Sequence, residues 1–152
     1  MRDPIEVAYL AGFFDGEGCI AINRVRSSLY LQVVQTRDRE PLDRFHAMFG
    51  GRVFLSNRRT LSGRTVWTWQ LHAEPMFTAL EAMLPYLTVK RDEARIALQY
   101  KRYPKGTNRL SVEDREARLD IMEKLRTIRH RTTDKSETQI GPVVSTGDIG
   151  VN

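Results

Sequence analysis

The chain has 152 residues, 41% of them hydrophobic and 28% charged, and this composition is typical of one soluble globular domain with a sizeable core. The formal net charge is +5 and the sequence pI is about 9.7, which favours a polyanionic partner. The only cysteine, Cys19, excludes an intrachain disulfide and a thiolate zinc cluster. The chain has no apolar run of membrane-spanning length and no secretory signal pattern. We therefore expect an intracellular protein, in the cytoplasm, nucleoid or an organelle matrix, that is neither secreted nor membrane-bound.

The first predicted element is a helix over residues 5–16 that carries a stripe of small residues. Ala8, Gly12 and Gly16 are spaced by four, so on a helix they lie along one face and allow a second helix to approach closely. Each glycine inside a helix costs about 1 kcal/mol of helix stability relative to alanine. Two glycines at this spacing therefore indicate that close packing against another helix offsets the cost. The stripe predicts that two copies of this helix pack together, with interface residues Ala8, Ala11, Gly12, Asp15 and Gly16.

Two carboxylates lie at the end of the same helix, where the helix dipole disfavours negative charge. The last carbonyl oxygens of a helix are also unpaired, and carboxylate and carbonyl oxygens together suit a hard divalent cation. Glu17 is therefore the predicted metal ligand, and two such sites across a dimer suit phosphodiester hydrolysis. The simpler interpretation is an exposed carboxylate after a helix; the small-residue stripe favours the metal site. Asp15 is interpreted as structural.

The pattern of hydrophobic residues after the first helix predicts two strand–strand–helix units. This order predicts an α+β domain in which helices cover one side of an antiparallel sheet. Helices are expected again from residue 91 and from a capping box that begins at Ser111. We predict one domain over residues 1–132 and a disordered polar tail over residues 133–152. The predicted strands span residues 19–36 (with a turn at 26–28), 52–57 and 65–71, and the two helices between them and after them span residues 38–49 and 75–84.

The uncovered face of the predicted sheet is rich in arginine, glutamine, asparagine and tyrosine. Arginine pairs with guanine, and asparagine or glutamine with adenine, in the major groove, which a two-stranded ribbon can enter. The simpler interpretation is a solvated face, but lysine and glutamate usually dominate such a face. We therefore predict DNA contacts from Asn23, Tyr30, Gln32, Arg52, Ser56, Arg58, Thr68 and Gln70.

Residues 10–18, with the sequence LAGFFDGEG, resemble the LAGLIDADG motif of homing endonucleases. The element order of the whole folded part also resembles that family's αββαββα domain with additional C-terminal helices. The resemblance implies a saddle-shaped antiparallel sheet that straddles the DNA major groove. Because the chain has one motif, the resemblance also implies a homodimer that acts on a long pseudo-palindromic target.

The resemblance extends to individual active-site positions. Glu17 occupies the penultimate acidic position of the motif, the family's metal ligand, where aspartate is common in single-motif members, and the resemblance implies that the Gly16 carbonyl assists it. Gln35 resembles the glutamine that orients water near the scissile phosphate, and Arg39 a basic active-site residue. Lys90 matches a lysine that stabilises the phosphate or assists proton transfer. By themselves Arg39 and Lys90 would be ordinary surface charges. The first hairpin is short, so it should contact fewer outer base pairs than in longer relatives.

The resemblance implies a homing endonuclease that uses Mg²⁺ for intron homing, with Mn²⁺ expected to substitute and Ca²⁺ expected to bind without supporting cleavage. Double-stranded DNA is the expected partner, with the chain's own intron RNA as a further one. The alternative is a non-cleaving binding protein on the same scaffold, either an intron splicing maturase or a transcriptional regulator. A third interpretation is a small helix-mediated dimer with no nucleic-acid role.

Overall fold

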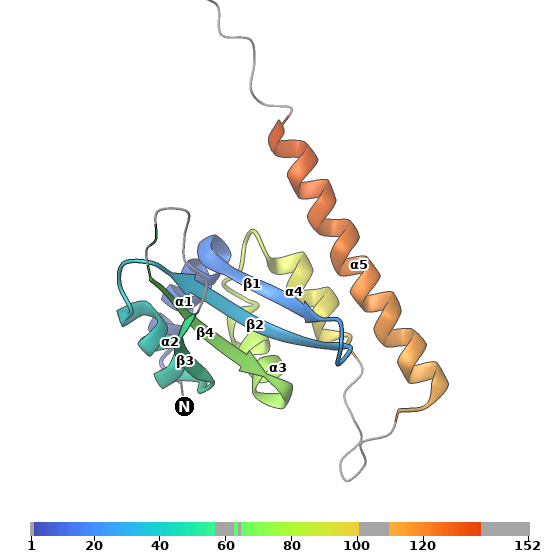
Figure 1. Ribbon diagram of the computed structural model, residues 1–152, viewed down its shortest axis with the longest axis horizontal. Helices are drawn as coiled ribbons and strands as arrows, with labels where there is room; N and C mark the ends of the chain where they lie inside the picture. The colour runs from blue at the N-terminus through green and yellow to red at the C-terminus, as the bar shows by residue number, and fades with distance from the viewer. Residues whose placement is uncertain (1, 57–62, 64, 101–109, 138–152) are drawn as a thin grey trace, which may run out of the picture.

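A computed structural model describes residues 2–56, 63, 65–100 and 110–137, and Figure 1 shows the arrangement of its elements. The helices and strands follow the predicted order: an opening helix, two strand–strand–helix units and two further helices. They are α1 (Pro4–Glu17), β1 (Gly18–Asn23), β2 (Ser28–Gln35), α2 (Glu40–Phe49), β3 (Arg52–Ser56), β4 (Val66–His72), α3 (Ala73–Met83), α4 (Arg91–Leu98) and α5 (Val112–Glu137).

The four strands form one antiparallel sheet with the order β1-β2-β4-β3. The two β-hairpins therefore meet along β2 and β4, where Gln32 lies opposite Gln70. In Figure 1 the sheet lies in front of α1, so one sheet face is covered by helices and the other is open. The predicted α+β fold class, with an antiparallel sheet covered on one side, is confirmed.

The core lies between the covered sheet face and the helices. Alternate strand residues, including Ile20, Leu31 and Trp69, are fully buried there against Leu10 and Phe14 of α1. The Trp69 indole N–H donates to the Gly50 carbonyl at 2.8 Å, which ties the sheet to the turn after α2. Gly51 in that turn has φ 88°, and a Cβ there would collide with the Gln70 carbonyl. The turn therefore requires glycine.

The C-terminal helix follows the predicted cap. Ser111 Oγ accepts the Asp114 backbone N–H at 3.0 Å, as expected for an N-cap. Arg129 holds α5 to the domain because its guanidinium donates to the Ile20 carbonyl and pairs with Glu93. The helix continues to Glu137, so the boundary predicted after residue 132 lies within it. Residues 138–152 of the predicted tail lie outside the described residues.

None of the helices among the described residues is long and apolar enough to cross a membrane.

Candidate nucleic-acid interface and acidic helix end

The open sheet face carries the polar side chains that the sequence predicted there. The register places Asn23, Tyr30, Gln32, Arg52, Ser56, Thr68 and Gln70 on this one face. Thr68 is nevertheless only 5% exposed, because its neighbours cover it, so its hydroxyl is poorly placed to reach a base. Arg58 lies outside the described residues.

A chain of side-chain contacts orders the centre of this face. Gln70 Nε2 donates to Gln32 Oε1 at 2.9 Å across the β2–β4 pair. The other end of the Gln70 amide, Oε1, lies 3.4 Å from His72 Nε2. His72 also stacks on Tyr30, with ring centroids 5.0 Å apart. In this arrangement both glutamine oxygens face protein partners, so the two amides offer N–H donors to a ligand.

The open face is also concave. A cavity of about 320 Å³ is lined by residues from β2, β3 and β4. Its lining includes Tyr30, Gln32 and Gln70, together with apolar Val34 and Phe54. This concave face combines hydrogen-bond donors, aromatic rings and apolar contacts. Such a combination suits the edges of nucleobases.

Asp15 has a structural role at the end of α1. Its carboxylate accepts the backbone N–H groups of Thr88 at 2.6 Å, Val89 at 3.1 Å and Lys90 at 2.9 Å, just before α4 begins. Burial alone would raise the pKa of Asp15, but these amides and the Lys90 ammonium together lower it. The carboxylate is thus fully engaged within the chain, in agreement with its predicted structural role.

Glu17, by contrast, is exposed at the end of α1. Nearby, the Lys90 ammonium donates to the Asp15 carbonyl. The pairing of Gly18 with Val33 puts the end of β2, and therefore Gln35, beside this helix end. The structure accordingly brings Glu17, Gln35 and Lys90 to one end of the sheet.

Arg39 reaches the same end of the sheet through Trp67. Trp67 lies opposite Gln35 in the β2–β4 register, and the Arg39 guanidinium carbon is 4.8 Å from its ring centroid. Arg39 Nε also pairs with Asp43 at 3.0 Å. Trp67 and His72 were not among the residues predicted from the sequence. Strand alternation could have found His72, two residues after Gln70 on the same face, whereas no local pattern links Trp67 to Arg39.

Gly12 and Gly16 of the small-residue stripe of α1 are exposed, and Ala8 is half-buried. A Cβ added to Gly12 or Gly16 would meet no atom within 4 Å, and Ile5 and Tyr9 beside the stripe are 80% and 43% exposed. The prediction for Ala11 needs correction: Ala11 is fully buried in the chain's own core and faces away from the stripe. Helix α1 is therefore apolar on its outer side as well as its inner side, as is typical of helices buried on both sides.

Among the described residues, no three His, Cys, Asp or Glu side chains gather closely enough to hold a metal ion. The end of α1 offers the right chemistry for a hard cation, a carboxylate beside main-chain carbonyls, but in the described part of one chain the carboxylate of Glu17 is the only one left exposed there. The end of α1 therefore has the right kind of ligands for a hard cation, but one copy of the chain supplies too few of them.

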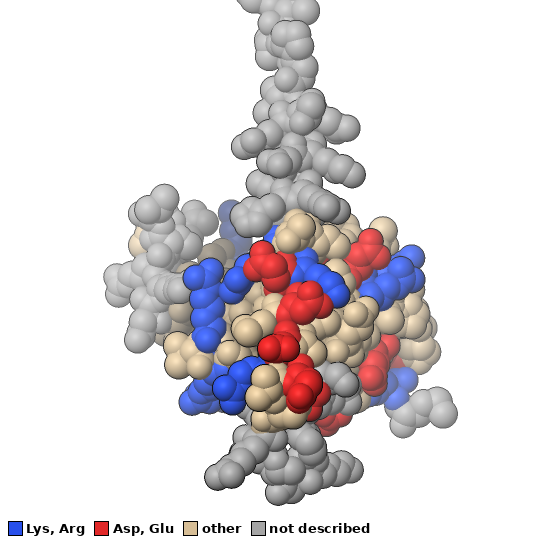
Figure 2. Space-filling model, turned by 90° about the vertical axis from the view of Figure 1, so that its right-hand side faces the viewer, with Lys and Arg blue, Asp and Glu red and all other residues tan. Residues whose placement is uncertain are grey.

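The side of the molecule formed by α5 has a different character. Figure 2 faces that side and shows a line of Asp and Glu side chains flanked by Lys and Arg. Several of these charges pair along α5, including Asp120 with Lys124 and Glu123 with Arg126. This side is a poor surface for a polyanion, in contrast to the open sheet face.

The fold is shared with a solved homing endonuclease. The structure of I-CvuI in complex with the I-CreI target matches with a TM-score of 0.51 and 22% identity, over 80% of this chain and 94% of that chain. The homing endonuclease I-TnaI matches with a TM-score of 0.48 and 20% identity, over 86% of this chain and 99% of that one. This likeness concerns the fold.

In sequence, the chain is 31% identical over 106 residues to the DNA endonuclease I-CvuI of Chlorella vulgaris. The alignment covers 64% of this chain and 65% of that relative, slightly less than two thirds of its length. No protein-family model matches the chain. The chain is therefore similar in sequence to a DNA endonuclease over part of its length, and it shares the fold of a solved homing endonuclease.

Proposed function

We propose that this protein is a site-specific DNA endonuclease that acts as a homodimer and hydrolyses phosphodiester bonds with a divalent metal ion. The observation that carries the proposal is the convergence of Glu17, Lys90 and Arg39 at one end of an open, polar sheet face. An acidic group among cations is what phosphoryl transfer requires: a metal ligand together with cations that stabilise phosphate charge. A protein that only binds DNA has no need of an exposed carboxylate beside a phosphate.

The open sheet face is the proposed surface for double-stranded DNA. The relative I-CvuI is a DNA endonuclease, and its solved structure holds a DNA target. In this chain the residues predicted to contact DNA, with the exceptions of Thr68 and Arg58, present polar groups on that face. The side formed by α5, by contrast, is unsuited to a polyanion. Base readout is assigned to Asn23, Tyr30, Gln32, Ser56 and Gln70, and Arg52, at the edge of the same face, is assigned a DNA contact of a different kind, argued below.

The proposed dimer is formed by the outer face of α1. Apolar Ile5 and Tyr9, with the stripe Ala8, Gly12 and Gly16, would be covered by the same helix of a second copy. This packing brings two copies of the α1 end together, and with them the second Glu17 that one chain lacks. The exposed small-residue stripe thus supports the dimer, and the dimer in turn supplies the second Glu17 that supports the metal site.

Each active-site residue has a proposed role. Glu17, with the Gly16 carbonyl, would hold Mg²⁺, for which Mn²⁺ would substitute and Ca²⁺ would bind without supporting cleavage; the bound ion would supply positive charge to the scissile phosphate. Gln35 orients the attacking water by hydrogen bonding. Lys90, fixed by its contact with the Asp15 carbonyl, and Arg39, fixed by Trp67 and Asp43, stabilise the negative charge of the phosphate.

The proposal is tested by selecting a target from a randomised duplex library with the wild-type chain in Ca²⁺ and then adding Mg²⁺. We expect a selected sequence with two related half-sites and a staggered double-strand break at its centre. Binding of the selected duplex without cleavage in Mg²⁺ or Mn²⁺ would instead support the maturase or regulator alternative, for which retention of intron RNA is the second measurement. Weak, salt-insensitive binding would reject a nucleic-acid role, since phosphate contacts make binding strongly salt-dependent.

A further inference from the structure

A second cavity, separate from the acidic helix end, opens at the far end of the sheet. It has a volume of about 580 Å³ and lies where β1 ends, β2 begins and β4 passes into α3. From Gly18 to Asn23, β1 advances about 3.3 Å per residue, so this cavity is roughly 17 Å from the Glu17 end. We call it the outer pocket and define it by Asn23, Arg26, Arg52, His72, Phe77 and Tyr100.

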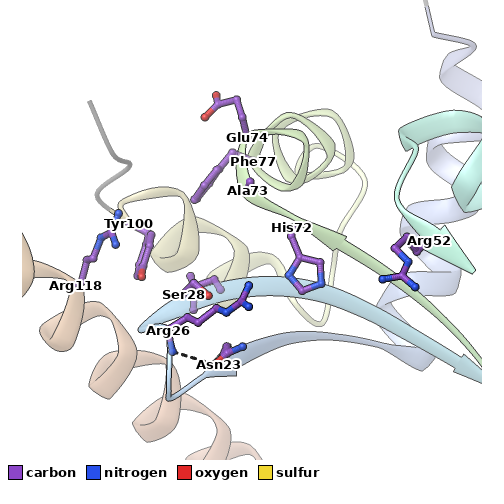
Figure 3. Close-up of a pocket in the computed structure, with 11 residues that line it drawn as sticks. Asn23, Arg26, Ser28, Arg52, His72, Ala73, Glu74, Phe77, Tyr100 and Arg118 are labelled. Carbon is purple, nitrogen blue, oxygen red and sulfur yellow. Dashed lines mark hydrogen bonds between the residues drawn. The ribbon is translucent and has the colours of Figure 1, made fainter. Parts of the chain in front are cut away.

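The rim of the outer pocket carries two guanidinium groups from different parts of the chain. Arg26 comes from the turn between β1 and β2, and Arg52 is the first residue of β3. Figure 3 shows both side chains directed toward His72, on the β4 strand between them. The turn is fixed in place because the Arg26 backbone N–H donates to Asn23 Oδ1 at 3.1 Å and the Tyr100 hydroxyl donates to the Ser27 carbonyl.

The charge of the rim is uncompensated. Within the described part of the chain, neither the Arg26 nor the Arg52 guanidinium forms an ion pair, and both are exposed. Partial burial, followed by the positive charges of these two arginines, lowers the pKa of His72. Glu74 is the one acidic residue of the lining, and Figure 3 shows its carboxylate directed away from His72 and Arg26.

The floor of the pocket is apolar. Phe77 and Tyr100 stack with ring centroids 6.3 Å apart, and Leu29 completes the lining beneath the rim. A cationic rim above an apolar floor suits an anion that carries an apolar body, and the volume exceeds that of a phosphate alone. A sugar–phosphate unit meets both requirements.

The position of the pocket identifies the source of that unit. His72 stacks on Tyr30, so the rim continues directly from the proposed base-reading face. We propose that the outer pocket binds a backbone phosphodiester of the DNA at the outer end of each half-site, through Arg26 and Arg52. This inference rests on the proposed function. It also accounts for the short turn of the first hairpin, residues 24–27, because a backbone contact replaces the base contacts that a longer hairpin would make.

The test compares wild type with Arg26→Gln and Arg52→Gln in their binding to the selected duplex across a range of salt concentrations in Ca²⁺. The matched control is Arg95→Gln, an exposed arginine of α4 paired with Asp92. We expect each rim variant to weaken binding several-fold for all base sequences alike and to reduce the slope of log K against log salt by about 0.9 per half-site, or about 1.8 for the dimer. Arg95→Gln should leave the slope unchanged.

Methylphosphonate substitution, which removes the charge of one phosphate at a time, locates the contact. The wild type should lose affinity when one outer phosphate of a half-site is neutralised, and the double variant Arg26→Gln/Arg52→Gln should be indifferent to the same substitution. Unchanged slopes for both rim variants, or a change in base preference in place of a change in slope, would overturn the pocket assignment alone. Failure of the wild type to bind any duplex would overturn the proposed function together with this inference.

Discussion

Asp15 and Lys90 are joined by two reciprocal hydrogen bonds: the Lys90 backbone N–H donates to the Asp15 carboxylate at 2.9 Å, and the Lys90 ammonium donates to the Asp15 carbonyl. This pair links the end of α1 to the start of α4 across 75 residues of sequence. It separates the roles of the two motif carboxylates. Asp15 positions Lys90 through these hydrogen bonds, whereas Glu17 is exposed to solvent.

Replacing Asp15 should therefore destabilise the fold. Asp15→Ala leaves three backbone N–H groups without their acceptor, and we expect a loss of about 1–3 kcal/mol in the free energy of unfolding at pH 7. Asp15→Asn, which keeps an acceptor oxygen but not the charge, should cost less. Urea denaturation of both variants beside wild type measures the difference.

The pH dependence of Asp15 follows from its lowered pKa. The unfolded carboxyl titrates near 3.9, so the charge-dependent stabilisation is complete above that pH and is lost as the pH falls through the lower folded pKa. The gap in stability between wild type and Asp15→Asn should be constant from pH 7 to pH 5 and should shrink below about pH 4. A gap that grows on acidification would contradict this account.

Enlarging Gly12 should break the dimer without harming the chain. A Cβ at Gly12 meets no atom of its own chain, and removing a helical glycine gains about 1 kcal/mol of helix stability. We expect Gly12→Leu to sediment as a folded monomer and to lose cleavage, while Gly12→Ala tests the smallest addition. A dimer that persists in Gly12→Leu would place the interface elsewhere.

The Gln32–Gln70 bond should restrict base preference. Gln32 Oε1 already accepts one hydrogen bond from Gln70, and this bond competes for the oxygen that bidentate adenine recognition uses. Repeating the target selection with Gln70→Ala should therefore increase adenine at the position that Gln32 reads. A double-mutant cycle on duplex affinity should give a coupling energy of about 0.5–1.5 kcal/mol. Unchanged preference and additive affinities would show that the bond opens on binding.

Trp67 and Asp43 are expected to position Arg39 for cleavage. Asp43→Asn weakens one contact without changing packing, and Trp67→Leu removes the ring beneath the guanidinium. We expect single-turnover cleavage to slow by several-fold to about tenfold in each, with duplex affinity nearly unchanged. Equal losses in affinity and rate would assign Arg39 to binding. Thermal unfolding of both variants controls for loss of structure.

Local patterns predicted the elements and the open face because strand alternation and helix caps depend on neighbouring residues. Ser111, for example, caps α5 as its spacing indicated. The contacts that join distant segments were not predictable in this way. The engagement of Asp15 by the chain before α4, the stacking of Arg39 on Trp67 and the outer pocket each depend on tertiary structure. Ala11 was misplaced because spacing alone does not show which side of an apolar helix faces its own core.

The most direct measurement is cleavage of the selected duplex in Mg²⁺ by Glu17→Gln, with Glu17→Asp as the matched control. Glutamine keeps the size of the side chain but removes the charge that a metal ion requires, whereas aspartate restores the charge with a shorter reach. The account predicts that Glu17→Gln binds the duplex as wild type does and cuts neither strand, and that Glu17→Asp still cuts. Cleavage by Glu17→Gln at the wild-type rate would contradict it.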